Sequence, residues 1–231
     1  MVDDEFEVRE TADGSLTVFH PEYGETYHSR HGALEEALHV FLREGGVQQR
    51  LEAGQSTRVL EVGFGLGLNF FLTAITALNN NAQLEYVSLE KQLLPERLFR
   101  EVDYAGLPGM EKLGLQFRDW CVNEQVSKEG VHSLRFDNGI TLTLIIGDAR
   151  EAEPEGLFDA IYMDAFSPDA NPELWSTAFL QFLADRLSSG GCLTTYSAKG
   201  DVRRSLLETG LAVEKRPGPP KKKEMLRAFK R

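Results

Sequence analysis

Short apolar runs alternate with amphipathic segments over most of the chain. Buried parallel strands are continuous apolar runs, whereas helices that cover a sheet carry apolar residues three and four positions apart. The runs predict seven core strands, at residues 58–62, 84–89, 140–146, 157–163, 191–196, 211–215 and 225–229. The amphipathic segments predict helices at residues 32–43, 68–78, 96–104, 110–127, 175–187 and 203–208. This alternation predicts an α/β fold with a mostly parallel sheet, helices on both faces and a crevice at the carboxyl ends of the strands.

Two regions depart from this alternation. Residues 6–8 and 15–19 flank Asp13-Gly14, a typical hairpin turn. With the helix at 32–43 they predict a hairpin and helix extension over residues 1–54, ahead of a main domain over residues 55–231. Residues 132–136 and 140–146 flank a second hairpin signal, Asp137-Asn138-Gly139. With the helix at 110–127 this hairpin predicts a local insertion at about residues 109–140.

The first core strand runs into Glu61-Val62-Gly63-Phe64-Gly65-Leu66-Gly67-Leu68-Asn69, where the next helix begins. Glycines at such a junction let the backbone turn sharply and approach a ligand, while helix N–H groups point at it. The spacing is not the dinucleotide fingerprint, because Leu68 stands where that pattern needs glycine or alanine. The segment predicts a pocket for a small-molecule cofactor, although three glycines also suit a simple tight loop.

Acidic residues stand at the ends of three successive strands: Glu61, Glu90 and Asp148. Glu90 lies about 20 residues after Gly67, the distance at which an acid holds the hydroxyls of a nucleoside ribose. Asp148 is placed to accept a hydrogen bond from an adenine amino group. Each acid alone is more often a solvated charge, but the three in this order favour an adenosine-containing cofactor.

Composition restricts the remaining classes. The chain has 231 residues, of which 42% are hydrophobic, which suffices for one globular domain but not for a second complete one. No apolar run reaches about 18 residues and residues 1–5 are mostly acidic, so we expect no membrane span, no signal peptide and a cytoplasmic location. Cys121 and Cys192 are far apart and the five histidines lack ligand spacing, so we expect free thiols and no metal.

Positive charge gathers near the end of the sequence. Residues 199–231 contain eleven lysines and arginines and four acids, although the whole chain has a net charge of −11. A basic face on an acidic protein can steer a polyanion toward a site. Taken alone, Lys221-Lys222-Lys223 is more often a solvated charge run.

The most distinctive local sequence is Asp164-Ala165-Phe166-Ser167-Pro168, followed by Asn171-Pro172-Glu173-Leu174-Trp175. It places an acid, an aromatic residue and prolines where the crevice of a parallel sheet opens, and proline stiffens such a loop. For Trp175 we favour packing in the core. For Phe166 packing and ligand contact are equally good interpretations.

Together with Thr195-Tyr196-Ser197-Ala198, Val202-Arg203-Arg204 and Lys222-Lys223-Glu224-Met225-Leu226, these segments resemble one family. It is the methyltransferase domain of the bifunctional tRNA 5-methylaminomethyl-2-thiouridine biosynthesis protein, and the resemblance covers roughly residues 23–231. It implies a Rossmann-like class I methyltransferase fold with a seven-stranded sheet and S-adenosyl-L-methionine as cofactor. It also implies methyl transfer to the aminomethyl group of 5-aminomethyl(-2-thio)uridine at the wobble position of the tRNA anticodon loop. Bifunctional members carry an FAD-dependent oxidase for which this chain has no room, so the stand-alone form is expected.

The resemblance further implies the site residues. Asp164 and Phe166 would be catalytic, the first orienting the amine and the second stacking on the wobble base. Because a carboxylate of ordinary pKa is a weak base for an ammonium, we expect positioning and electrostatic stabilisation to dominate. Cofactor contacts are expected from Glu61, Gly63, Phe64, Gly65, Gly67, Asn69, Glu90, Asp148, Ala149 and Asp164. Substrate contacts are expected from Tyr27, Ser29, Pro168, Asn171, Tyr196, Arg203, Arg204, Lys221, Lys222 and Lys223.

Three other classes remain open. A small-molecule amine methyltransferase would share every feature up to Asp164, but would bind tRNA no better than other acidic proteins do. A polyamine-synthase-like aminopropyltransferase shares the fold but needs several acids around its amine, and this loop offers only Asp164 and Asp169. A non-catalytic nucleotide-binding module would not need so elaborate a loop beside the methyl site.

Overall fold

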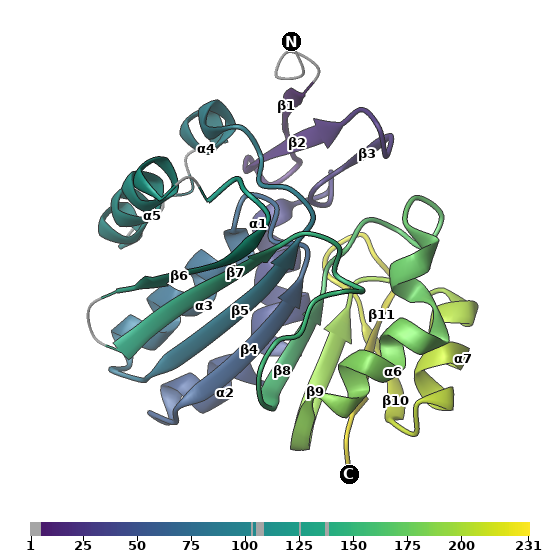
Figure 1. Cartoon of the computed structure of the whole chain (residues 1–231). Helices are drawn as coiled ribbons and strands as arrows, with labels where there is room; N and C mark the ends of the chain where they lie inside the picture. The colour runs from purple at the N-terminus through teal and green to yellow at the C-terminus, as the bar shows by residue number, and fades with distance from the viewer. Residues whose placement is uncertain (1–5, 103, 105–108, 125, 137–138) are drawn as a thin grey trace.

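The main sheet of the computed structural model has eight strands, in the order β10-β11-β9-β8-β4-β5-β7-β6 (Figure 1). The structure describes residues 6–102, 104, 109–124, 126–136 and 139–231. The strands are β4 (Thr57–Val62), β5 (Leu84–Glu90), β6 (Gly130–Arg135), β7 (Ile140–Ile146), β8 (Phe158–Met163), β9 (Leu187–Thr195), β10 (Ala212–Pro217) and β11 (Glu224–Phe229). Strands β4, β5, β7, β8 and β9 run parallel, and β11 lies antiparallel between β9 and β10.

All seven predicted core strands are present, and the sheet has one strand more than the seven expected. The additional strand, β6, belongs to the predicted insertion and pairs antiparallel with β7 from Gly130↔Ile146 to Arg135↔Thr141. Because β6 continues the hydrogen-bonded ladder of β7, the hairpin enlarges the main sheet at its edge. The turn residues Asp137 and Asn138 and residues 1–5 lie outside the described residues.

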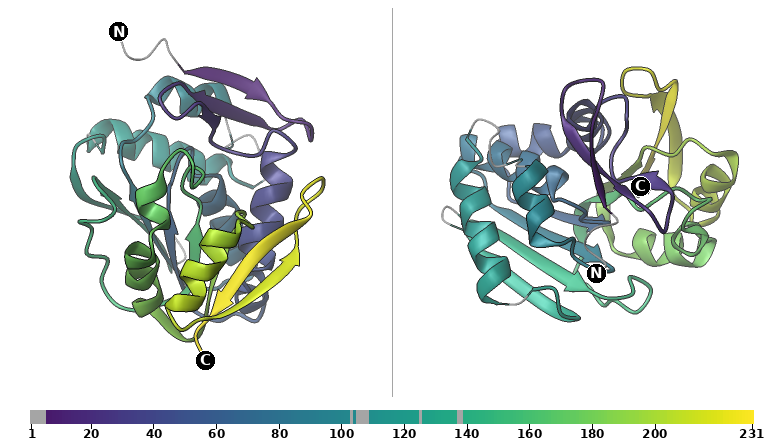
Figure 2. Two further views of the ribbon diagram at one scale, coloured as in Figure 1. Left: turned by 90° about the vertical axis from the view of Figure 1, so that its right-hand side faces the viewer. Right: turned by 90° about the horizontal axis from the view of Figure 1, so that it is seen from above.

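Both faces of the sheet are covered by helices, as predicted. Successive residues of a strand point to opposite faces, so Val59 and Leu60 of β4 enter different hydrophobic clusters, and both are fully buried. Helices α2 (Val47–Glu52) and α3 (Leu68–Asn79) pack on the first face, and α6 (Thr177–Asp185) and α7 (Gly200–Glu208) pack on the second (Figures 1 and 2). Each fully buried aliphatic side chain contributes roughly 1.5–3 kcal/mol, which explains why most of the fully buried positions of these strands are apolar.

The remaining helices follow the predicted pattern with altered bounds. The first predicted helix is α1 (Ala33–Glu36) continued by a π-helical segment, Ala37–Arg43. Helices α4 (Glu96–Val102) and α5 (Glu111–Asn123) precede β6. Helix α6 begins later than predicted, because Ser176 caps it by accepting a hydrogen bond from the N–H of Phe179.

The N-terminal extension forms a small antiparallel sheet of β1 (Glu7–Glu10), β2 (Leu16–His20) and β3 (Glu25–Thr26). The predicted hairpin is confirmed by the pairing of β1 with β2, and β3 is an addition. This small sheet lies over the carboxyl ends of the parallel strands (Figures 1 and 2). It therefore roofs the crevice in which the sequence places the site, while the domain boundary at residues 54–55 stays a prediction.

Candidate active site

A cavity of about 850 Å³ opens at the carboxyl ends of β4, β5, β7 and β8. Residues 62–65, 89–92, 147–150 and 164–167 line it from the main sheet. Residues 19, 20 and 22–31 line it from the N-terminal sheet and the segment that follows. Small-molecule sites have volumes of roughly 300–1,000 Å³, so the cavity can enclose a cofactor together with part of a substrate.

The glycine loop after β4 forms the floor of the cavity, and its glycines are required by geometry. Gly63 has φ of 92° and Gly65 has φ of 54°, values that side chains with a Cβ rarely adopt. A Cβ on Gly63 would lie 2.9 Å from the backbone oxygen of Asp164, and one on Gly65 would lie 2.9 Å from Cδ1 of Tyr27. The loop thus touches both the segment after β8 and the N-terminal roof. Gly67 precedes α3 and does not line the cavity.

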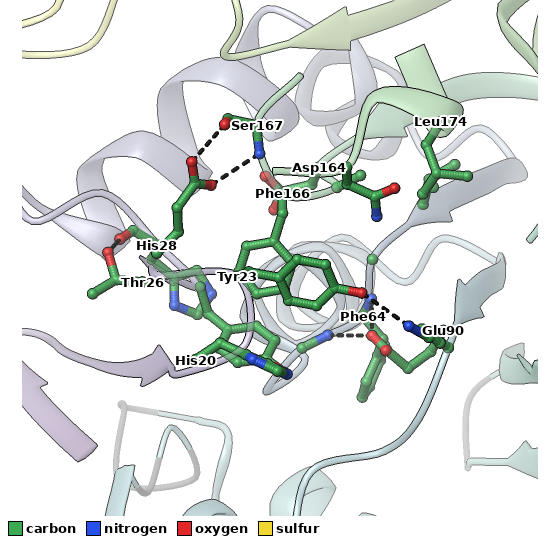
Figure 3. Close-up of a pocket in the computed structure, with 18 of the residues that line it drawn as sticks. His20, Tyr23, Thr26, His28, Phe64, Glu90, Asp164, Phe166, Ser167 and Leu174 are labelled. Atoms are coloured by element: carbon green, nitrogen blue, oxygen red, sulfur yellow. Dashed lines mark hydrogen bonds between the residues drawn. The ribbon is translucent and has the colours of Figure 1, made fainter. Parts of the chain in front are cut away.

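Glu90 ends β5 and lies against the glycine loop. Its Oε2 atom accepts hydrogen bonds from the N–H groups of Phe64 and Gly65, each over 2.9 Å (Figure 3). Its Oε1 atom accepts one from the N–H of Gln92 over 3.2 Å. Burial raises the pKa of Glu90, and the backbone donors partly offset that effect. The side chain lines the cavity, and its predicted hold on a ribose stays a prediction.

Asp148 and Ala149 line the neighbouring wall after β7. Asp148 is half-exposed, and its two carboxylate oxygens accept hydrogen bonds from Nε of Arg150 over 3.0 and 3.1 Å. These bonds lower the pKa of Asp148 to about 2, so the residue is an anion at neutral pH. Arg150 was not predicted from the sequence, and it fixes where this carboxylate can point.

Glu61 and Asn69 do not line the cavity and instead lie beneath it. The Nδ2 atom of Asn69 donates to Oε1 of Glu61 over 2.9 Å and to Oδ2 of Asp164 over 2.8 Å. The other oxygen of Glu61 accepts a hydrogen bond from the hydroxyl of Ser88 over 2.9 Å. Asn69 therefore connects the acid of the glycine motif to the acid of the loop after β8.

Burial raises the pKa of Glu61 to about 8, and the hydrogen bonds from Asn69 and Ser88 oppose this effect. Burial also raises the pKa of Asp164 well above its ordinary value, and the nearby acids Glu61 and Glu36 raise it further. The amide of Asn69 and the ammonium of Lys222 act in the opposite direction. Three acids, Glu36, Glu61 and Asp164, thus stand near a single lysine, Lys222, and a cationic ligand would favour their ionised forms.

An aromatic cluster stands above Asp164. The rings of Tyr23 and Phe166 stack with centroids 4.4 Å apart, and Tyr27 meets Phe166 edge-on at 5.0 Å (Figure 3). His20 contacts Tyr23, Tyr27 and Phe166 at 4.7–5.8 Å. Phe166, for which packing and ligand contact were equally favoured, therefore packs against the N-terminal roof and lines the cavity as well. Trp175 is buried in the core, as expected.

Several polar contacts fasten the walls of the cavity. The carboxylate of Glu25 accepts hydrogen bonds from the N–H and the hydroxyl of Ser167 (Figure 3). Lys222 forms an ion pair with buried Glu36, and its ammonium lies 4.7 Å from the centre of the Tyr196 ring. The Tyr196 hydroxyl donates to the backbone oxygen of Ala165 over 2.8 Å. Segments near both ends of the chain therefore hold the loop after β8 in place.

The predicted substrate residues divide into two groups. Tyr27, Ser29, Asn171, Tyr196 and Lys222 line the cavity. The others do not line it, and they are Pro168, Arg203, Arg204, Lys221 and Lys223. Arg204 is ion-paired with Asp201, and Lys221 and Lys223 are exposed beside Lys222.

Apart from Tyr27 and Ser29, sequence reasoning missed the residues that the N-terminal region contributes to the cavity. His20, Tyr23, Glu25 and Glu36 all line it, and so does Lys91, which donates a hydrogen bond to the Tyr23 hydroxyl over 3.2 Å. The one available signal was the density of aromatic and histidine residues between positions 19 and 31. Such a density in a short polar segment is unusual for a simple hairpin.

Two further findings concern the described residues only. No helix among them is both long enough and apolar enough to cross a membrane. They contain no group of three or more His, Cys, Asp or Glu side chains arranged to hold a metal ion.

Comparison with known proteins gives concordant results. Residues 116–231 match the model of a family described as S-adenosyl-L-methionine-dependent methyltransferase. The tRNA 5-methylaminomethyl-2-thiouridine biosynthesis bifunctional protein MnmC of Aromatoleum aromaticum is 38% identical over 212 residues, which cover 89% of this chain and 32% of that protein. The MnmC protein of Azoarcus sp. strain BH72 is 38% identical over 222 residues, which cover 91% of this chain and 34% of that protein. The chain thus spans about one third of the length of these relatives.

A solved structure extends the similarity to the fold. The crystal structure of MnmC2 from Aquifex aeolicus matches with a TM-score of 0.76 and 32% sequence identity. The match covers 97% of this chain and 70% of that one. The N-terminal roof and the C-terminal strands therefore both fall within the region of similarity.

Proposed function

Because the chain belongs to the family of S-adenosyl-L-methionine-dependent methyltransferases that includes MnmC2, we propose that it methylates the aminomethyl group of 5-aminomethyl(-2-thio)uridine in tRNA. The product would be 5-methylaminomethyl(-2-thio)uridine at the wobble position. One observation carries the proposal. A single cavity brings together the glycine loop, the Glu90 carboxylate and the Asp164 loop of a chain whose relatives are named for this modification.

The cavity fits the cofactor in shape and charge. Gly63 and Gly65 line the cavity without side chains, so a ligand can approach the backbone closely. Oε1 of Glu90 accepts a single hydrogen bond in the described structure and can accept more from ribose hydroxyls. Ala149 offers apolar surface for an adenine ring, with Asp148 beside it, whereas the ring of Phe64 packs in the core against Phe70 and Phe117. The acids around Asp164 suit a ligand with positive charge.

When bound, adenosylmethionine supplies a methyl group on a positively charged sulfur. The protein then has to present a neutral amine in line with that methyl group, although a free alkylamine is mostly protonated at pH 7. We assign Asp164 to this step. A proton of the substrate's ammonium group passes to a carboxylate oxygen of Asp164, which leaves a neutral amine whose lone pair is free to attack the methyl carbon.

The burial of Asp164 changes the expected strength of its carboxylate as a proton acceptor. A carboxylate of ordinary pKa is a weak base for an ammonium, but the raised pKa of Asp164 makes it a stronger proton acceptor. The group must still be an anion when it acts. The hydrogen bond from Asn69 and the ammonium of Lys222 both favour the anion, and a cationic cofactor would do the same.

The aromatic cluster gives the cavity a wall suited to a nucleobase. Unpaired bases in RNA loops can be splayed out and stacked on aromatic side chains. Because Tyr23 covers one face of Phe166, we assign base contact to Tyr23 and Phe166 jointly.

A tRNA substrate also implies a cytoplasmic location for the protein, which is part of this proposal.

The proposal is tested by transfer of labelled methyl from adenosylmethionine to tRNA from cells that lack this protein, followed by nucleoside analysis. We expect label in 5-methylaminomethyl-type uridine. Asp164→Asn should lower turnover by about 100-fold or more without abolishing adenosylmethionine binding, because general base catalysis contributes about 10²–10⁴. Asp169→Asn is the matched control, since Asp169 is exposed in the same loop and is paired with Lys199.

Each alternative function predicts a different result of the labelling experiment. Label in small amines but not in tRNA would move the protein to the small-molecule methyltransferases. Transfer of an aminopropyl group in place of methyl would assign it to the aminopropyltransferases. Cofactor binding without transfer to any acceptor would leave a nucleotide-binding module. Wild-type turnover in Asp164→Asn would remove Asp164 from the mechanism.

A further inference from the structure

The turn between β10 and β11 directs one lysine of three into the cavity. Lys222 points to Glu36, whereas Lys221 and Lys223 are exposed. Lys221 has φ of 68°, a left-handed conformation that costs roughly 1–2 kcal/mol for a residue with a side chain. Among the described non-glycine residues, it shares a positive φ only with Asn81. The backbone of the turn therefore decides which lysine faces inward.

Several hydrogen bonds hold this turn rigid. The N–H of Gly218 donates to the carbonyl of Lys223 over 3.2 Å, and the N–H of Lys222 donates to the carbonyl of Pro219 over 2.9 Å. Nε2 of His39, in the π-helical segment, donates to the carbonyl of Pro217 over 2.9 Å. A rigid turn presents its exposed lysines in fixed positions, which lowers the entropy cost of binding.

Glu36 joins this turn to a second basic segment. One of its oxygens pairs with Lys222, and the other accepts a hydrogen bond from the N–H of Ser29 over 3.2 Å. The residues after Ser29 are Arg30 and His31, which are exposed and line the cavity. A single buried carboxylate thus fixes two basic segments at the mouth of the same cavity.

Two exposed cations at this mouth have side chains without a polar partner among the described residues. In the described part of the chain, the side chains of Arg30 and Lys221 form no hydrogen bond and no ion pair. Basic residues with acidic partners nearby include Arg9 with Glu7, Arg150 with Asp148, Lys199 with Asp169 and Arg204 with Asp201.

The mouth also carries exposed acids. Glu129 and Glu173 line the cavity and are solvent-exposed. Like Asp148 and Asn171, both residues line the cavity, near the wall that is predicted to bind the cofactor. Repulsion would direct a polyanion away from these acids and toward the basic segments.

We infer that Arg30, His31, Lys221 and Lys223 form one phosphate-binding rim at the cavity mouth, and that Glu36 holds its two halves together. The rim takes RNA phosphates on either side of the nucleotide whose base enters the cavity. This inference rests on the proposed function and names the part of the protein that recognises the RNA backbone. It assigns Lys222 to the support of the rim and not to phosphate contact.

The salt dependence of tRNA binding tests the rim. Each phosphate contact contributes about 0.7–0.9 to the slope of log affinity against log salt concentration. The variant Arg30→Ala/Lys221→Ala/Lys223→Ala should lose about two units of slope and bind tRNA at least about tenfold more weakly at low salt. Its affinity for adenosylmethionine should not change. A charge-matched control is Arg43→Ala/Arg135→Ala/Arg231→Ala, since these exposed residues do not line the cavity.

Glu36 provides a second test, because charge alone and loss of the anchor predict opposite changes in tRNA affinity. Removing an acid from a protein that binds RNA should strengthen binding by charge alone. Glu36→Gln should instead weaken tRNA binding and lower the salt slope, because the two basic segments lose their common anchor. Glu35→Gln is the matched control on the same helix, since Glu35 is exposed, and it should bind at least as tightly as wild type. Tighter binding by Glu36→Gln would overturn the anchoring role.

The outcomes separate the rim from the proposed function. Wild-type protein that methylates tRNA, together with equal salt slopes in the rim and control variants, would overturn the rim and leave the function intact. Wild-type protein that neither binds nor methylates tRNA would overturn both. A reduced slope in the rim variant alone supports the rim.

Discussion

The side-chain amide of Asn69 donates a hydrogen bond to Oδ2 of Asp164 over 2.8 Å, across 95 residues of sequence. The same nitrogen donates to Glu61 over 2.9 Å, so the two carboxylates share one donor group. Asn69 lies in the first turn of α3, directly after the glycine loop. The position of the proposed proton acceptor therefore depends on the same loop that forms the cofactor cradle.

Replacing Asn69 tests this dependence. Asn69→Ala should lower turnover by about 100-fold, since a small misplacement of a reacting group has that effect, and should shift the pH midpoint of turnover upward. It should also destabilise the fold by about 1–3 kcal/mol, because buried carboxylates lose their donor. Asn80→Ala, at the far end of α3, is the control. A pH profile unchanged from wild type would contradict the positioning role.

Glu61 should make stability fall with rising pH. Burial raises its pKa from 4.5 to about 8, so between these values the folded protein holds a proton that the unfolded chain releases. Its stabilising contribution is full below about pH 4.5 and is lost as the pH rises through 8. The free energy of unfolding should drop by up to about 1.4 kcal/mol per pH unit in this window.

Denaturant titrations between pH 6.5 and 8 isolate this effect. Below pH 6.5 the buried residue His28, whose pKa burial lowers to about 4, acts with the opposite sign. Glu61→Gln should flatten the slope, with a remainder from Asp164 and Glu90, whose pKa values are also raised by burial. Identical slopes for wild type and variant would show that Glu61 does not titrate in this range.

The glycine loop should tolerate no Cβ at position 63. Gly63→Ala places a Cβ 2.9 Å from the backbone of Asp164, in addition to the strain of φ at 92°. Gly54→Ala has a similar strain, with φ at 69°, but no atom within 4 Å. We expect about 1–2 kcal/mol for Gly54→Ala, and for Gly63→Ala a larger loss together with lost adenosylmethionine affinity. Unfolding and calorimetric binding would measure both, and equal costs would refute the close approach.

Tyr23 should matter through its ring. Tyr23→Ala removes the stack on Phe166, and aromatic pairs contribute about 0.5–1.5 kcal/mol beyond their buried area. The KM for tRNA should therefore rise about two- to tenfold. Tyr23→Phe keeps the ring and loses only the exposed hydrogen bond from Lys91, so its KM should stay within about twofold of wild type. A similar KM for all three proteins would exclude a role of the ring in substrate binding.

The core strands and the glycine loop could be predicted because they depend on residues that are close together in the sequence. The core strands are continuous apolar runs, and the glycine loop combines its turn and its close approach within a few residues. Glu90 and Asp148 were placed from their strand ends, because the carboxyl ends of parallel strands meet at one edge of a sheet. Glu61 ends a strand in the same way, yet it lies beneath the loop. Its contacts with Asn69 and Ser88 decide this, and no spacing rule reports them.

Long-range contacts explain what the sequence could not predict. Strand β3 has two residues, too few for a periodic signal, and Glu25 meets Ser167 across 142 residues. The three consecutive lysines are chemically equivalent in sequence, and only the left-handed backbone at Lys221 distinguishes Lys222 from its neighbours. The eighth strand was predicted as a hairpin arm, but its pairing with the main sheet depends on register along β7.

The pair formed by Glu36 and Lys222 joins residues 186 positions apart. Contacts of such separation form after local structure during folding, because closing a long loop has an entropy cost that nearby contacts do not have. On the ribosome, the walls of the cavity can meet only after the turn before β11 has emerged. A nascent chain can therefore gain the full stabilisation by its ligand only after residue 222 has emerged, and ligand binding reports that the segments around the cavity have folded.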